Sequence, residues 1–266
     1  MVDDPDITFD PAAFKLLYQT EDRHFWFRAR NDAIATVMRS VTATLPSGYR
    51  LLEVGCGNGN VTRALEQAGP TGDITAMDTF DEGLAYARQR VRRARIVRGD
   101  ILRDDPAPAP RYDVIGMFDV LEHLDDDLGV LRRLHSMIVP GGALVLTVPC
   151  DMALWSDFDR ISHHKRRYEA TNLAEAIEAS GFAVEYLTPF MSTLYPLMWL
   201  TRRRWRKSAH AAISPEQAAK LAARELRIIP GVNEVLYATA RQESRVLARR
   251  RRLPFGTSLI AVGRVR

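Results

Sequence analysis

Three glycines at alternate positions, Gly55, Gly57 and Gly59, are the residues of this sequence best suited to hold a ligand. They follow an apolar run at 50–54 and precede residues of helical composition at 61–68. Because glycine lacks a Cβ, a ligand can lie against exposed backbone N–H groups at the positive N-terminus of the helix. A plain tight turn would use the same residues, so a binding loop is indicated only if acidic partners follow.

Two aspartates stand where a nucleoside would need hydrogen-bond acceptors. Asp78 ends the second expected strand, 19 residues after Gly59, and could accept hydrogen bonds from both ribose hydroxyls. Asp100 follows Gly99 after the third expected strand and could accept from an adenine amino group, with Ile101 packing on the ring. Asp100 could equally cap a helix.

The glycine spacing bears on which cofactor such a loop could hold. A dinucleotide fingerprint requires a third glycine at the position of Asn60, so this loop suits an amino acid and a ribose better than a pyrophosphate. An NAD(P)-dependent oxidoreductase stays an alternative, because it would also place an acid at Asp78. A non-catalytic cofactor-binding scaffold is a second alternative, although a scaffold has no need of these acids and glycines.

The elements that must position these residues alternate between strand and helix from residue 50 onward, which predicts a parallel sheet covered on both faces. Continuous apolar runs such as 143–148 are typical of strands buried on both faces. We expect strands at 50–54, 73–77, 95–98, 112–118, 143–148, 183–188 and 256–265, and helices at 61–68, 81–93, 126–138 and 172–180.

Helical segments flank this pattern. We predict an N-terminal helical cap at 1–46, a cofactor-binding core at 47–188, a helical insertion at 189–253 and a last core strand at 254–266. The two helical additions are the natural places for a substrate lid, because the core can do little but hold the cofactor.

Charge and cysteine content restrict the possible partners, the possible disulfide or zinc sites and the cellular location of the protein. Residues 1–159 carry a net charge of −8 and residues 160–266 one of +12, which favours an anionic partner for the C-terminal part or a solvated basic face. Cys56 and Cys150 are too few for a disulfide framework or a zinc ligand set. The acidic first residues lack the features of a secretory signal, so we expect a cytoplasmic protein.

The motifs in this order resemble those of the class I S-adenosylmethionine-dependent methyltransferases, over about residues 50–188 and the last ten. The likeness rests on the glycine loop, Asp78, Gly99-Asp100, the run Phe118-Asp119-Val120-Leu121-Glu122-His123-Leu124, and Pro140-Gly141-Gly142. It implies an α/β, Rossmann-like, seven-stranded and mostly parallel sheet with an antiparallel last strand, carrying helical N-terminal and C-terminal insertion caps. It also implies S-adenosyl-L-methionine as the cofactor, across the carboxyl ends of the first strands.

By this resemblance the core residues expected to bind the cofactor are Glu53, Gly55, Cys56, Gly57, Gly59, Asp78, Thr79, Asp100, Ile101, Phe118 and Asp119. Residues 21–30 and 164–168 also resemble segments of a bacterial subgroup that is loosely associated with glycan, lipid and secondary metabolism. Within the first segment, Trp26 and Arg30 could close over the cofactor, the arginine pairing with its carboxylate. A helix that simply packs its aromatic residues on the sheet would show the same pattern.

The reaction implied is transfer of a methyl group to an oxygen, or less readily a nitrogen or carbon, of a small molecule, glycan or lipid-linked metabolite. A hydroxyl acceptor would need a general base, for which His123, His163 and His164 are the candidates; a carboxylate acceptor would need none. We expect no metal ion, since the sequence shows no ligand cluster, and no nucleic-acid partner.

The apolar stretch at 186–199 is followed by Arg202, Arg203, Arg204 and Arg206. It is interrupted by two prolines and is too short to span a bilayer, which takes about 20 residues. It could be a lid over the active site, or an interfacial segment whose arginines meet anionic headgroups at the inner face of the membrane.

Overall fold

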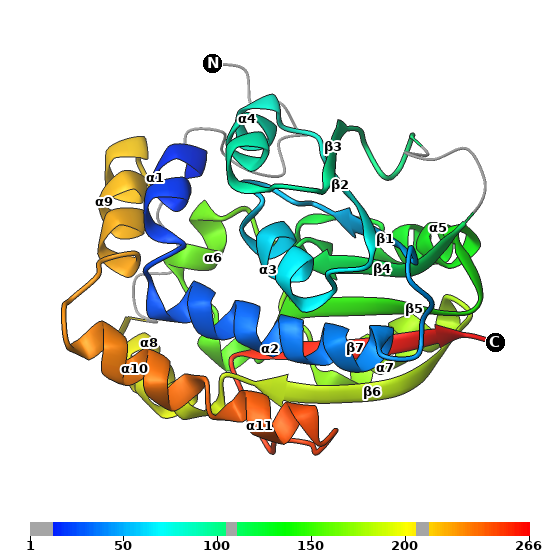
Figure 1. The fold of residues 1–266 in the computed structure, drawn as a ribbon. Coiled ribbons are helices and arrows are strands. Elements are labelled where there is room, and N and C mark those ends of the chain that lie inside the picture. Colours follow the sequence, from blue (N-terminus) through cyan, green and yellow to red (C-terminus); the bar gives the residue numbers. More distant parts are fainter. Residues whose placement is uncertain (1–12, 105–110, 206–212) are drawn as a thin grey trace.

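The computed structural model describes residues 13–104, 111–205 and 213–266. Its centre is a seven-stranded sheet in the order β3-β2-β1-β4-β5-β7-β6 (Figure 1). All pairs are parallel except those of β7, which is antiparallel to β5 and β6, so the expected fold class is confirmed. The strands are β1 Arg50–Val54, β2 Asp73–Asp78, β3 Arg95–Arg98, β4 Tyr112–Phe118, β5 Ile138–Pro149, β6 Phe182–Phe190 and β7 Ser258–Val265.

The fifth strand differs from its prediction. Pro140-Gly141-Gly142 was expected to be a turn before a strand at 143–148, but β5 already begins at Ile138. Ile138 pairs with Tyr112 before an irregularity in the ladder, and regular pairing with β4 starts at Ala143. The preceding helix therefore ends at Met137 and the chain enters the sheet without a separate loop.

Helices cover both faces of the sheet, as buried strands on a parallel sheet require. One core layer joins the sheet to α5 and α7, and the other joins it to α2, α3 and α11. In Figure 1, α2 crosses in front of the sheet. The helices are α1 Ala13–Thr20, α2 Phe25–Thr42, α3 Asn60–Ala68, α4 Asp81–Arg90, α5 Asp127–Met137, α6 Asp157–Ile161, α7 Ala170–Ala179, α8 Tyr195–Trp205, α9 Pro215–Glu225, α10 Val232–Ala240 and α11 Glu243–Ala248, with short 3-10 turns η1 Leu121–His123, η2 Met152–Leu154 and η3 Ser192–Leu194.

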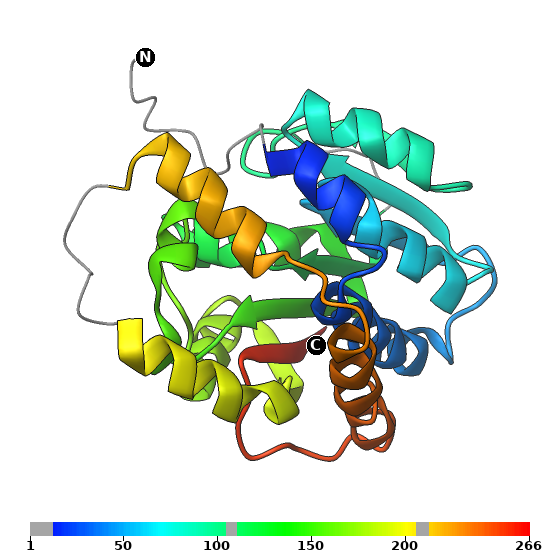
Figure 2. The same ribbon diagram turned by 90° about the vertical axis from the view of Figure 1, so that its left-hand side faces the viewer.

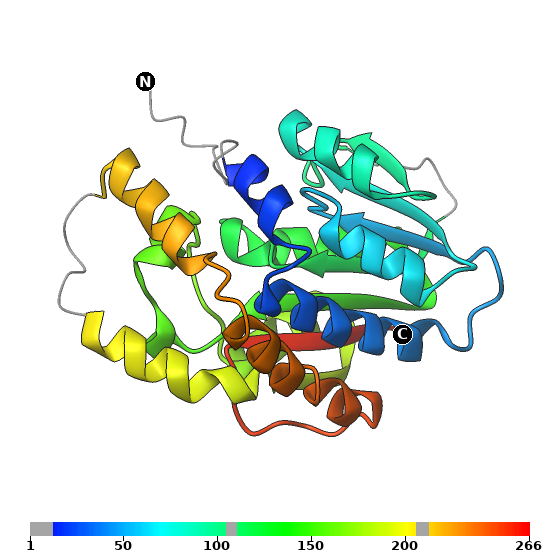
Figure 3. The same cartoon turned by 60° about the vertical axis from the view of Figure 1, so that its left-hand side comes forward.

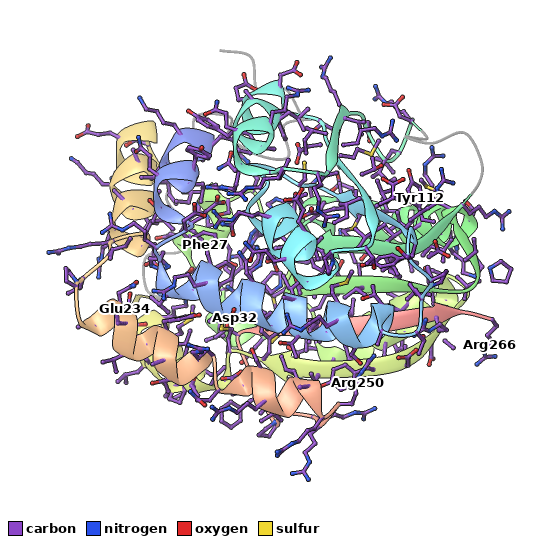
Figure 4. The ribbon with its side chains drawn as sticks, viewed as in Figure 1. Phe27, Asp32, Tyr112, Glu234, Arg250 and Arg266 are labelled. Atoms are coloured by element: carbon purple, nitrogen blue, oxygen red, sulfur yellow. The ribbon has the colours of Figure 1, made fainter. Side chains whose placement is uncertain are left out.

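The helices between β6 and β7 dock onto the N-terminal helices. The side chain of Asn233 in α10 accepts a hydrogen bond from the amide of Phe25 (2.9 Å) and donates one to the carbonyl of Arg23 (3.0 Å). The hydroxyl of Tyr237 donates to Asp32 (2.8 Å), and Glu234 pairs with Arg28 (2.7 Å). Figure 4 shows Asp32 and Glu234 along the line where α2 and α10 meet. The N-terminal helices and the helices between β6 and β7 are thus in direct contact.

Figures 2 and 3 show α8 to α11, coloured yellow to orange, gathered on the side of the molecule that also carries α1 and the start of α2. Two of these helices also contact elements outside the group: α9 contacts α6, and α8 contacts η2. Among the described residues, no helix is both long and apolar enough to cross a membrane.

Candidate active site

The glycine loop connects β1 to α3 in a conformation that glycine allows. Gly55, Gly57 and Gly59 all have positive φ, at 77°, 49° and 72°. A Cβ added to Gly55 would lie 2.3 Å from a methyl group of Val120, so that position is closed by packing. A Cβ on Gly57 would meet only the ring of Phe14, at 3.7 Å. Gly57 is therefore the position at which the loop backbone stays approachable.

Helix α1 covers this loop. Phe14 is buried, and its carbonyl accepts a hydrogen bond from the side-chain amide of Asn58 in the loop (2.9 Å). Arg90 of α4 pairs with Glu21 (2.5 Å) and donates to the carbonyls of Asn58 (3.1 Å) and Tyr18 (3.0 Å). These contacts tie the N-terminal helix to the loop from two sides.

Asp78 lies at the end of β2, beside the loop. One carboxylate oxygen accepts from the amide of Gly57 (2.7 Å) and the other from the amide of Phe80 (3.0 Å). Burial raises the pKa of Asp78, while the amides of Phe80, Gly57 and Thr79 oppose that shift. Each carboxylate oxygen can accept more than one hydrogen bond, so Asp78 can shape the loop and still receive a ribose hydroxyl.

The other acidic position, Asp100, is half-buried in a turn. It accepts a hydrogen bond from the amide of Leu102 (2.9 Å) and pairs with Arg103 (3.5 Å). Ile101 is buried in the core layer of α5 and α7. The described residues after Asp100 form a turn and not a helix, so Asp100 does not cap a helix there, and the contact with an adenine ring stays a prediction.

Two further residues of the expected cofactor set differ in exposure. Thr79 is exposed, whereas Cys56 is a buried thiol packed against Ala76 and Leu84. Burial raises the pKa of Cys56 well above its ordinary value. Both cysteines of the chain are free.

Arg30 reaches from α2 to the carboxyl end of β4. It forms an ion pair with Asp119 and donates a hydrogen bond to the carbonyl of Phe118 (3.0 Å). Its guanidinium lies 5.5 Å from the ring centre of Trp26, which is half-buried and packs against the core layer of α2. Asp119 has a positive φ of 53°, an uncommon conformation for a residue with a side chain. These four residues, which the sequence assigned to the cofactor, are thus brought together.

Two further carboxyl groups are buried at this edge of the sheet. Burial raises the pKa of Glu53 to about 8, against the opposing charge of Arg30. Burial, and then the charge of Asp119, raise the pKa of Glu122 well above its ordinary value. Neither oxygen of Glu122 has a hydrogen-bond partner among the described residues.

The structure brings together two of the three candidate histidines. The rings of His123 and His164 meet edge to face, with centroids 4.9 Å apart. His163 is exposed at a turn with a positive φ of 56°. Nδ1 of His164 lies 3.0 Å from Asp159, and its Nε2 lies 3.9 Å from Glu122. His123 and His164 are therefore the pair that could act on an acceptor.

Asp159 is a residue of this site that the sequence did not reveal. It is fully buried, and it accepts hydrogen bonds from the amide of Ser156 (2.8 Å) and from Nε of Arg167 (2.8 Å). Burial alone would raise the pKa of Asp159, but His164, Arg167 and Arg202 together hold it well below its usual range.

The position of Arg202 corrects one expectation. Contact with lipid headgroups was one of the two alternatives for its segment, but the guanidinium of Arg202 is largely buried, lies 3.5 Å from Asp159 and donates to the carbonyl of Leu154. It ties α8 to the loop of His164. Arg206 and the side chains of Arg203 and Arg204 lie outside the described part of the chain.

The raised pKa of Glu53 predicts a pH-dependent contribution to stability. Between about pH 4.5 and 8 the folded state keeps a proton on Glu53 that the unfolded chain has released, so stability falls as the pH rises. We expect the free energy of unfolding of the wild type to fall relative to Glu53→Gln by up to about 1.4 kcal/mol per pH unit across this window. Urea unfolding at several pH values measures the difference. The control is Glu82→Gln, at an exposed position on α4. Its free energy of unfolding should change with pH as that of the wild type does.

Comparison with known proteins agrees with this geometry. Residues 18–187 match the methyltransferase domain family. A probable S-adenosylmethionine-dependent methyltransferase of Mycolicibacterium smegmatis is 28% identical over 166 residues, which make up 62% of each chain. A ubiquinone biosynthesis O-methyltransferase of Cereibacter sphaeroides is 30% identical over 111 residues, or 40% of this chain and 44% of the relative. The chain thus spans less than two thirds of the length of these relatives.

A Haloferax volcanii methyltransferase, solved with its activator Trm112, is similar in fold with a TM-score of 0.57 and 17% identity, over 96% of this chain and 93% of the other. At that identity the similarity concerns the fold alone. The family match covers more than half of the chain. This protein therefore belongs to the methyltransferase domain family, with the Rossmann-like fold of enzymes whose methyl donor is S-adenosylmethionine.

Proposed function

We propose that this chain transfers a methyl group from S-adenosylmethionine to an oxygen atom of a small metabolite. The observation that carries the proposal is the pair of His123 and His164, with His164 oriented by Asp159. A hydroxyl group becomes a nucleophile as its proton leaves, and an oriented imidazole is the commonest proton acceptor in enzymes. The similarity to an O-methyltransferase supports the same acceptor atom.

The glycine loop and Asp78 suit the cofactor. Gly57 leaves backbone approachable where a Cβ would otherwise stand, and both oxygens of Asp78 keep acceptor capacity. By the same proposal Asp100 and Ile101 border the adenine, and Phe118 and Asp119 border the methionine part. When bound, the cofactor supplies a methyl group that its sulfonium has already activated for in-line displacement.

The residues of the chain then have two tasks. The first is to hold the acceptor oxygen in line with the methyl group, and such orientation can supply about 7–11 kcal/mol of the barrier reduction. The second is to take the proton. If Nδ1–H of His164 donates to Asp159, its Nε2 keeps the lone pair and faces Glu122 and His123. This arrangement leaves Nε2 as the proposed base.

Replacing Asp78 tests the cofactor site. Asp78→Asn keeps the shape but removes the charge and half of the acceptor capacity, and a hydrogen bond to a charged group contributes about 1.5–3 kcal/mol. We expect a loss of roughly tenfold or more in affinity for S-adenosylmethionine, measured by calorimetry. The control is Asp73→Asn, at the exposed start of the same strand, which should bind as the wild type does. Equal affinity in all three proteins would remove Asp78 from the site.

Replacing His164 tests the reaction. With labelled S-adenosylmethionine and fractionated hydroxyl metabolites from a cell extract, we expect a methylated product. We expect His164→Gln to slow its formation by about 10²–10⁴-fold, the usual contribution of a general base, at unchanged affinity for the cofactor. His163→Gln is the matched control and should keep full turnover. An unaffected His164→Gln would reject the base, and the absence of any product would favour a non-catalytic scaffold.

The exposed face of α8 bears on the class of acceptor. Leu197, Trp199 and Leu200 are 52%, 38% and 52% exposed, and Phe255 beside them is 45% exposed. A shallow apolar groove runs between them, lined by Tyr195, Pro196, Trp199, Leu200 and Phe255. Since Arg202 ties this helix to Asp159, the groove belongs to the element next to the histidine pair. We propose that this face meets the apolar part of an amphiphilic or lipid-linked acceptor, as a lid or at the inner surface of an anionic membrane.

Vesicle flotation separates the lid from the membrane surface. If the face is interfacial, we expect weak binding to anionic vesicles that falls as salt is added, and its loss in the double variant Trp199→Ser, Leu200→Ser. Val235→Ser, which changes an exposed apolar residue of α10, should leave flotation unchanged. If the wild type stays with the soluble fraction at low salt, the face is a lid.

A further inference from the structure

Three side chains that could each bind a metal ion meet at the end of β4. Glu122 and His123 come from η1, and His164 comes from the segment between α6 and α7. One ligand atom of each lies within 4.8 Å of the others. Sequence spacing did not predict this group, because His164 is 41 residues away from His123.

A cation beside Glu122 would stabilise its buried carboxylate. Its side chain is fully buried, and neither carboxylate oxygen has a hydrogen-bond partner among the described residues. A buried carboxylate without partners is strongly unfavourable, so such a group stays protonated or is paired with a positive charge. Arg30 is engaged by Asp119 and the carbonyl of Phe118. The side of Glu122 that faces His164 is where a positive charge could be added.

His164 is held as a metal-binding histidine usually is. Its Nδ1 is 3.0 Å from Asp159, and its Nε2 is 3.9 Å from Oε1 of Glu122. Metal-bound histidines almost always donate their second ring N–H to a carboxylate, carbonyl or water, which fixes the tautomer. Asp159 is itself fixed by Ser156 and Arg167, so the ring is oriented before any ion binds.

We propose that Glu122, His123 and His164 bind a divalent transition-metal cation. Two imidazoles and one carboxylate suit Zn²⁺, Mn²⁺ or Fe²⁺, whereas Mg²⁺ and Ca²⁺ prefer sites built from oxygen alone. Ligands at about 2.0–2.2 Å from one ion lie roughly 3–3.5 Å apart, so ligand atoms that are up to 4.8 Å apart need to close by up to about 1.3–1.8 Å. Both histidines are only partly buried, which leaves coordination positions open toward an incoming oxygen.

The site would change how the acceptor is activated. Resting on the proposed function, a bound cation would take the acceptor oxygen as a ligand and lower the pKa of its hydroxyl. Nε2 of His164 would then hold the metal, and the proton would leave to solvent. The metal-binding claim itself needs neither the acceptor nor the cofactor.

The test is a titration of the demetallated full chain with Zn²⁺ and with Mn²⁺, followed by calorimetry, and with Co²⁺, followed by visible absorption. We expect one ion per chain. Glu122→Gln keeps the shape of the buried side chain but cannot become the carboxylate that would bind the ion, and His164→Asn removes one ligand. Each should raise the Kd by at least about tenfold, since even indirect partners of metal ligands change affinity by about 10–100-fold. His163→Asn, the exposed neighbour, should bind as the wild type does.

Thermal unfolding without metal checks that Glu122→Gln is folded. The inference is overturned if the wild type binds no ion, if Glu122→Gln binds as tightly as the wild type, or if His163→Asn loses as much affinity as His164→Asn. Calorimetry with S-adenosylmethionine and the methyl-transfer assay run alongside separate the two claims. Methyl transfer that survives a chelator contradicts only the role of the metal in activating the acceptor, whereas metal binding without any methylated product contradicts the proposed function alone.

Discussion

The ion pair between Arg30 and Asp119 is the interaction on which the carboxyl edge of the sheet depends. Glu53 and Glu122 are also buried at this edge. Burial raises the pKa of both carboxyl groups, and the charge of Arg30 offsets part of that rise. An unpaired buried charge costs several kcal/mol, so an arginine shared among several buried acids limits how many of them can ionise together. Glu53 at the end of β1 and Glu122 in η1 therefore have raised pKa values. Asp119, which follows β4, forms the ion pair with Arg30.

The same arginine fixes where α2 lies. Because Arg30 is bound at the strand end, the start of α2 is held over the sheet, and α10 docks on that start through Asn233 and Glu234. A second anchor comes from α8, whose Arg202 reaches Asp159 beside His164. The helices between β6 and β7 are thus connected to the site at both ends, by way of α2 and by way of Asp159.

The sequence predicted those features of the fold that leave a pattern in the order of apolar residues or in family motifs. The apolar runs gave the strands, since burial on both faces leaves a continuous pattern, as in β5. The antiparallel last strand came from the family resemblance, because periodicity does not report strand direction. The domain boundaries at residues 46, 188 and 253 and the roles of the individual cofactor residues stay predictions.

The partners of the site could not be predicted in the same way. Glu122 stood within a recognised motif, but its lack of hydrogen-bond partners is a tertiary property. Asp159 lies in a segment with no motif, and His164 meets it only because a short helix turns the chain back. Arg202 looked like one member of a basic run, and a charge run carries no information about which member is buried.

Phe14 brings the N-terminal helix against the glycine loop of the candidate site. Its ring is what a side chain at Gly57 would meet, and Asn58 of the same loop donates to its carbonyl. The strands of the sheet need none of α1 to pair with one another, yet the surface above the loop is incomplete without it. A chain that begins at α2 would keep the core layer that α2 forms with the sheet, but it would lack the cover that Phe14 provides over the loop. The core of the sheet and the surface above the loop therefore depend on different lengths of the N-terminal chain.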